Sequence, residues 1–387
     1  MIKKIINKLN NNQEKLLLIL CYFILYYISS SYMYNRYDPD VLATSYDSGR
    51  YLNLENFFAE TVTGETIAWH LFFTYRLFVT ILENINLIQH YVEVQYFIFY
   101  LSSILFYKSL LNFKFTKKTS FLSTVFIVCN PFIIFWIHTL NHAGLTISLL
   151  MITFFFLSKY DHGKIFKIFF FISLFLLLKV DGKVFFSVFM MLFYKFYLIE
   201  KNKPIFNFLI LSVFFIIYFL YLSKFAVTLE PFSEIYFQTD LIKNHFNFIK
   251  IDDAAVKTYN KCLIIEYNSL RNHLCALLDN PLYSIKVYAT RFFILLTWIN
   301  AKLSFKYNFF AFGMMIFLYC GLFLDLFKTK FTNLKFFLIS AYLLTIIIML
   351  PYILRGDQKQ VFYGLLFIIP LSFSGYEIFY KYLKKKL

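Results

Sequence analysis

The chain has 387 residues, of which 60% are hydrophobic and 23% aromatic, and it carries a formal net charge of +16. A soluble protein of this length keeps too much surface in water to hide so many apolar side chains, so a water-soluble enzyme or binding domain is excluded. The positive charge does not require a nucleic-acid partner, because lysines on the cytoplasmic side of a membrane protein give the same balance. We therefore predict an all-α integral membrane protein.

Apolar runs long enough to cross a bilayer predict a single membrane domain, 1–387, with about ten transmembrane helices joined by short turns. The first span is interpreted as a retained anchor, because no small-residue cleavage site follows it. Two interrupted apolar stretches, 68–83 and 286–300, are interpreted as half-inserted or interfacial helices. The predicted spans are 16–33, 90–111, 119–136, 142–158, 165–179, 183–199, 205–223, 307–326, 335–352 and 359–380.

Lysines gather in alternate connections between the predicted spans. They crowd the N-terminus, the C-terminal tail and the segments 108–118, 159–167, 195–203 and 328–335. Few acids accompany them, whereas cations and acids balance in the opposite connections. The positive-inside rule makes the lysine-rich side cytoplasmic, together with both termini. We expect a multi-pass protein of the bacterial inner (plasma) membrane.

Two segments on the predicted outer side are longer and more polar than the turns. The first outer loop, 34–67, is rich in acids, and 224–286 is the only long hydrophilic stretch. Apolar residues at helical spacings predict that 224–286 is mostly helical. A disulfide between its Cys262 and Cys275 is one alternative in an oxidising compartment, although a single straight helix would separate them by about 20 Å.

Asp47 lies at the start of a predicted amphipathic helix in the first outer loop. If 47–58 is helical, Asp47 and Tyr51 share a face, with Arg50 beside them. One interpretation is a helix N-cap, because a carboxylate is stabilised at that position. The other is a reaction site, since an acid, an arginine and a tyrosine then meet at the water-facing mouth of an apolar bundle.

Asp-x-x-Arg-Tyr followed by a short amphipathic helix, directly after the first span, resembles the GT-C membrane glycosyltransferases. The branch it resembles most is that of the protein O-mannosyltransferases and lipid A aminoarabinose transferases. Further stretches are similar to segments of that family in the same order along the chain. They are Asn130-Pro131, the turn 178–182, Asn280-Pro281 with Arg291 downstream, and the segment 355–359 before the last helix. This chain departs from the family in having Asn141-His142 where an acid is common and Lys359-Gln360 where Arg-Tyr is common.

The resemblance implies an enzyme that moves a sugar from a polyprenyl-phosphate carrier to an acceptor hydroxyl on the outer face. The acceptor would be a membrane lipid such as lipopolysaccharide, a cell-envelope glycan or a protein. Asp47 would be the catalytic partner of the acceptor hydroxyl, and cations would stabilise the departing phosphate. No cofactor is assigned, and whether the enzyme uses a divalent cation stays open. The candidate substrate-binding residues are Arg50, Tyr51, His70, Lys179, Asp181, Lys183, Arg355, Asp357 and Lys359.

Each of these residues also has a structural interpretation. The cations at helix ends could simply extend to the lipid headgroups. Asp181 could form an ion pair with Lys179 or Lys183. His138 and His142 are four residues apart, a spacing compatible with metal binding on one helix. Because the nearby sequence offers no third ligand, we interpret them as a wet or interfacial pair.

Two other functions stay open. A polysaccharide polymerase or O-antigen ligase would place its key arginines and histidines in a large late outer loop, where this chain has Arg271, His245 and His273. A lipid or solute transporter without chemistry would be favoured by broken helices with charges at the membrane midplane. The sequence instead collects its charges at helix ends.

Overall fold

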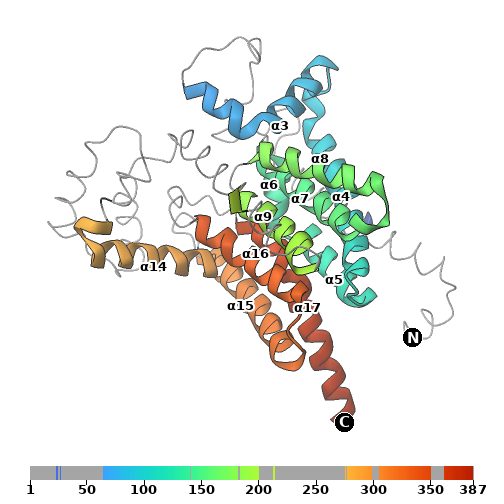
Figure 1. Ribbon diagram of the computed structural model, residues 1–387, viewed down its shortest axis with the longest axis vertical. Helices are drawn as coiled ribbons and strands as arrows, with labels where there is room; N and C mark the ends of the chain where they lie inside the picture. The colour runs from blue at the N-terminus through green and yellow to red at the C-terminus, as the bar shows by residue number, and fades with distance from the viewer. Residues whose placement is uncertain are drawn as a thin grey trace.

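The computed structural model describes residues 64–139, 141–181, 184–199, 275, 277–298, 305–349 and 361–386, with single residues at 23, 24, 27, 212 and 213. The described residues are almost entirely helical and include no strand, which confirms the all-α prediction. The helices pack as a bundle around a core of aromatic and aliphatic side chains (Figure 1). The predicted spans 16–33 and 205–223 lie almost wholly outside the described residues.

The described helices fall into two groups along the chain. The first group is α3 (Gly64–Asn84), η2 (Ile88–His90), α4 (Tyr91–Asn112), α5 (Lys117–Val128), α6 (Pro131–His138), α7 (His142–Ser158), η3 (Tyr160–His162), α8 (Lys164–Val180) and α9 (Phe185–Phe193), which continues into the π-helix η5 (Tyr194–Ile199). The second group is α14 (Pro281–Thr297), α15 (Phe305–Lys328), α16 (Asn333–Met349) and α17 (Val361–Lys386).

Three stretches of the described chain are helical, long and apolar enough to cross a membrane. They are Ile88–Asn112, Asn308–Lys328 and Phe362–Lys385, and α5 with α6 makes a fourth if that bent pair is one span. Shorter apolar helices cover His142–Ser158, Phe185–Ile199 and Asn333–Ile347. These helices support a membrane protein, while the count of about ten spans stays a prediction.

The predicted span 119–136 is divided into two helices, because the chain bends by 52° between α5 and α6. The Asn130 side chain accepts hydrogen bonds from the amides of Phe132, at 3.0 Å, and Ile133, at 3.4 Å. Pro131 occupies the first helical position of α6, where its missing N–H costs nothing. Asn130-Pro131 is therefore a helix start within the bundle, and the chain runs on through α6 before it reaches a turn.

Polar contacts join the helix ends in two separate sets. In one set, Asn112 donates to Ser158 across 2.9 Å and Lys195 meets Asp161 across 2.6 Å. We call this the lysine-rich end; it holds the turns 113–116, 159–163 and 329–332 and the end of α17. The other set we call the histidine end; it holds the ends of α6 and α8 and the starts of α4, α7 and α17. The lysines of the described turns thus lie at one end, as the sequence predicts.

The helices α15, α16 and α17 lie side by side, and α15 crosses α17 with backbone against backbone (Figure 1). A Cβ atom built on Gly375 would lie 1.9 Å from the carbonyl oxygen of Gly321. The Ser372 hydroxyl adds a hydrogen bond of 2.7 Å to the Leu318 carbonyl. Small residues at a crossing allow this approach, which is how helices associate where water supplies no driving force.

Two neighbouring helices differ in what surrounds them. No residue of α7 is exposed, because α4, α6, α8 and α17 pack around it. One side of α8 instead exposes large apolar side chains. They are Ile165, Ile168, Phe169, Phe171, Ile172 and Phe175.

The helix α14 extends sideways from the bundle and corresponds to the predicted interfacial stretch 286–300 (Figure 1). Its carboxyl end is held by Trp298, which is fully buried with a φ of +61°. The indole ring lies edge-on to Phe362, with ring centroids 4.3 Å apart. Upstream of α14, Cys275 is disulfide-bonded, whereas Cys262 lies outside the described residues.

Candidate functional site

Asp181 is the centre of a buried polar cluster at the histidine end. One of its carboxylate oxygens, Oδ2, accepts a hydrogen bond of 3.0 Å from the Tyr363 hydroxyl and lies 3.2 Å from Nε2 of His142. The side chains of His142 and Asp181 are only 4% and 2% exposed. Because a buried carboxylate is costly without partners, these contacts stabilise its charge. They also tie the end of α8 to the starts of α7 and α17.

Local sequence positions each member of the cluster. Asn141 caps α7 by accepting a hydrogen bond of 3.0 Å from the Ala143 amide, so that His142 becomes the first helical residue. Asp181 follows α8 in an extended conformation, which ends that helix and turns the carboxylate toward its neighbours. Tyr75 of α3 covers the cluster, with its ring edge-on to the His142 ring at 6.4 Å.

His138 belongs to a second buried group, between α4 and α6. Its Nδ1 lies 3.4 Å from the Tyr96 hydroxyl, and its carbonyl accepts a hydrogen bond of 3.0 Å from Tyr91. The prediction of two histidines on one helix is wrong, because α6 ends at His138 and α7 begins at His142. Both are buried, so they are not a wet pair. In the described part of the chain, no three His, Cys, Asp or Glu residues are arranged to hold a metal ion.

Only part of the predicted site falls within the described residues. Lys179 is half-buried in the last turn of α8, two residues before Asp181. His70 lies on α3, but only its backbone is described. The contact between Asp181 and Tyr363 brings the end of α8 to the first turn of α17. The remaining candidates lie outside the described residues: Asp47, Arg50, Tyr51, Lys183, Arg355, Asp357 and Lys359.

The sequence did not identify His142 and Tyr363 as partners of Asp181. A signal exists for His142, because Asn141-His142 occupies the place where the resembled family commonly has an acid. For Tyr363 the only signal is its position four residues after Lys359. On α3, Arg76 is buried as well, and Thr74 fixes that helix to α8 through a hydrogen bond of 2.9 Å to the Leu176 carbonyl.

No known protein family, curated protein or solved structure matches this chain. The chemistry of the site therefore comes from its own geometry. The pair of His142 and Asp181 places an imidazole ring against a buried carboxylate. Asp181, His142 and Tyr363 are nearly fully buried, and their contacts hold the end of α8 against the starts of α7 and α17.

Removing the Tyr363 hydroxyl tests how much this cluster stabilises the bundle. We expect Tyr363→Phe to lower the free energy of unfolding by roughly 1.5–3 kcal/mol, because hydrogen bonds to charged groups contribute that much. The matched control is Tyr376→Phe, also on α17, whose hydroxyl donates to the Phe317 carbonyl on the exposed side at 2.7 Å. That variant should lose about 1 kcal/mol or less. Equal losses in denaturant titrations of the two purified variants would contradict a special role for the cluster.

Proposed function

We propose that this protein is an integral membrane glycosyltransferase, which moves a sugar from a polyprenyl-phosphate carrier to an acceptor hydroxyl at the histidine end. The hydrogen bond between Tyr363 and Asp181 is the observation that carries the proposal. It joins one of the stretches that resemble the GT-C family, at Asp181, to the helix that follows another, 355–359. This contact between side chains 182 positions apart in the chain supports the proposal, because it brings the two regions together.

The histidine end would face the outside of a bacterial plasma membrane. Two observations support this orientation. The described lysine-rich turns lie at the opposite end, which the positive-inside rule assigns to the cytoplasm. The disulfide-bonded Cys275 belongs to the segment that leads into α14, and a disulfide fits an oxidising outer compartment.

In the proposed reaction the acceptor oxygen attacks the anomeric carbon, and the bond from that carbon to the phosphate oxygen breaks. The acceptor proton passes to the Asp47 carboxylate, and the polyprenyl phosphate leaves with the bonding electrons. Cations stabilise the phosphate as its charge develops. The candidates for this role are Lys179, Lys183, Arg355 and Lys359, while Arg50, Tyr51, His70 and Asp357 would orient the donor and the acceptor.

Replacing Asp47 tests this function directly. In vesicles containing the purified protein and radiolabelled polyprenyl-phosphate sugars, we expect Asp47→Asn to lower transfer by about 10²-fold or more, because the proton acceptor is lost. The matched control is Glu60→Gln in the same loop, which removes one acid and should keep the wild-type rate. Full transfer by Asp47→Asn would remove this residue from the mechanism. No transfer by the wild-type protein with any such donor would overturn the function.

The 52° break between α5 and α6 favours a second candidate, a lipid or solute transporter. The groups at this break are uncharged, and Asn130 already binds the amide donors that begin α6. A transporter would move labelled lipid across the vesicle membrane without making a new covalent product. A polymerase or ligase would make product but depend on Arg271, so Arg271→Ala would then be more damaging than Asp47→Asn.

A further inference from the structure

Three helix ends meet at the lysine-rich end: the start of α5, the end of α15 and the last turns of α17. Thr119 of α5 donates a hydrogen bond of 2.7 Å to Glu377, while the glycine crossing fixes α15 to α17. Two lysines from the flanking helices lie over tyrosine rings of α17. The Lys118 ammonium is 4.9 Å from the Tyr380 ring centre, and that of Lys328 is 5.0 Å from the Tyr382 ring centre. We call these four residues the lysine–tyrosine collar.

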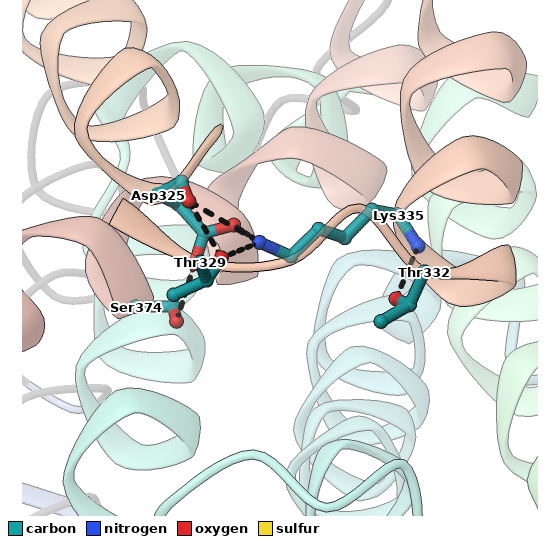
Figure 2. Close-up of polar contacts among 5 residues, drawn as sticks. All are labelled: Asp325, Thr329, Thr332, Lys335 and Ser374. Atoms are coloured by element: carbon teal, nitrogen blue, oxygen red, sulfur yellow. Dashed lines mark hydrogen bonds and ion pairs between the residues drawn. The ribbon is translucent and has the colours of Figure 1, made fainter. Parts of the chain in front are cut away.

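The acids near the collar are already bound to cations. Asp325 is 1% exposed and points into the helix interface, where Lys335 contacts its carboxylate and Ser374 donates a hydrogen bond of 2.8 Å (Figure 2). Glu377 pairs with Lys381 across 2.6 Å, and its side chain is only 10% exposed. These acids therefore cannot balance the lysines on the surface of the collar.

The surface at the collar is consequently positive and aromatic. Lys114, Lys118, Lys328, Lys330, Lys384 and Lys385 are exposed. Tyr380 and Tyr382 are also exposed, at 57% and 41%. Tyrosine favours the boundary between hydrocarbon and headgroups, and lysine lays its apolar stem along such rings while its ammonium stays among the headgroups.

The length of α17 puts the collar at that boundary. Its 26 residues extend about 39 Å, whereas the hydrocarbon core of a bilayer is about 30 Å thick. If α17 begins near the outer boundary, its last two turns leave the hydrocarbon at the inner one. Tyr380 and Tyr382 lie in these turns, so that their flanking lysines reach the phosphates of the inner leaflet.

We propose that the lysine–tyrosine collar is a binding site for anionic phospholipids, such as phosphatidylglycerol. Tyr380 and Tyr382 point to different sides of α17, so each lysine contacts the phosphate of a lipid on its own side, where the tyrosine ring packs against the upper acyl chains. The lysine ammonium groups select lipids with a net negative headgroup over zwitterionic ones. This binding is separate from any effect of the lysines on insertion, because it stabilises the protein after folding. It does not depend on the transferase proposal.

Thermal unfolding of the full-length protein in mixed micelles tests the site. Phosphatidylglycerol should raise the midpoint temperature above the value in phosphatidylcholine. The double variant Lys118→Gln/Lys328→Gln should lose about half of this shift or more, because charge near a membrane acts on anionic lipid over short distances. The matched control, Lys108→Gln/Lys164→Gln, removes two exposed lysines at the same end and should keep the full shift.

Substitutions of the two tyrosines test whether their aromatic rings contribute to lipid binding. Tyr380→Phe/Tyr382→Phe should keep the shift, whereas Tyr380→Ala/Tyr382→Ala should reduce it as the lysine variant does. Equal shifts in the collar and control variants would overturn a defined site in favour of a general charge effect. The same shift with inorganic phosphate alone would also overturn the proposal, because the lipid would then be unnecessary. So would the absence of any shift with phosphatidylglycerol.

Discussion

Replacing Lys335 with Met is expected to lower the free energy of unfolding by about 3–5 kcal/mol, because it leaves Asp325 as a buried charge without its cation. Lys335 contacts the Asp325 carboxylate and the Thr329 hydroxyl, and it donates to the Asp325 carbonyl across 3.3 Å (Figure 2). These contacts close the turn between α15 and α16. Ser374 extends the network to α17.

The double variant Asp325→Asn/Lys335→Met should recover most of that loss. It removes both charges, while the amide oxygen introduced in place of the carboxylate can still accept the hydrogen bond from Ser374. Denaturant titrations in one detergent would compare the wild-type protein, the two single variants and the double variant. Lys330→Met is the control in the same turn, since Lys330 is exposed and should change stability by about 0.5 kcal/mol or less. A cost for Lys335→Met as small as that of Lys330→Met would contradict a buried ion pair.

Gly375→Ala is expected to be the most damaging single-methyl addition among the described glycines. Its new methyl group would lie 1.9 Å from the Gly321 carbonyl oxygen, so α15 and α17 must separate. We expect a loss of about 3 kcal/mol, at the upper end of the usual cost of overpacking.

Gly313→Ala on α15 is the matched control, because no atom lies within 4 Å of its new methyl group. The better helix propensity of alanine should make this variant neutral or more stable by up to about 1 kcal/mol. Unfolding midpoints of the two variants in the same detergent would separate packing from propensity. Equal stability would mean that α15 and α17 do not approach as closely as described.

Helix positions were predictable wherever an apolar run ended in polar turn residues. The expected 142–158 agrees with α7, and 90–111 agrees with α4 within one residue. The span predicted over 119–136 ran through Asn130-Pro131, because proline alone does not decide whether a helix ends. Pro370 lies inside α17 without ending it, whereas Pro131 follows an asparagine that caps a new helix. The capping asparagine before Pro131 therefore explains why a helix starts there and not at Pro370.

The candidate site was predictable as a set of segments but not as a set of contacts. Asp181 was identified from its turn, yet its partners come from helices far away in the chain, and no periodic pattern reports such distances. Lys195 was assigned to the cytoplasmic side on charge, and it does lie at the lysine-rich end. It is nevertheless buried, because η5 turns it inward onto Asp161 and the Tyr160 ring.

The contrast between α7 and α8 has a consequence for how this sequence can change over time. The outward residues of α8 are largely exposed, so they can change among Ile, Phe, Leu and Val at little cost in packing. Every side of α7 meets fitted protein atoms, and Gly144 already has the Gln95 side chain and the backbone of α6 within 3.1 Å of where a methyl group would lie. Variation should therefore accumulate along one stripe of α8, while α7 keeps its residues on all sides.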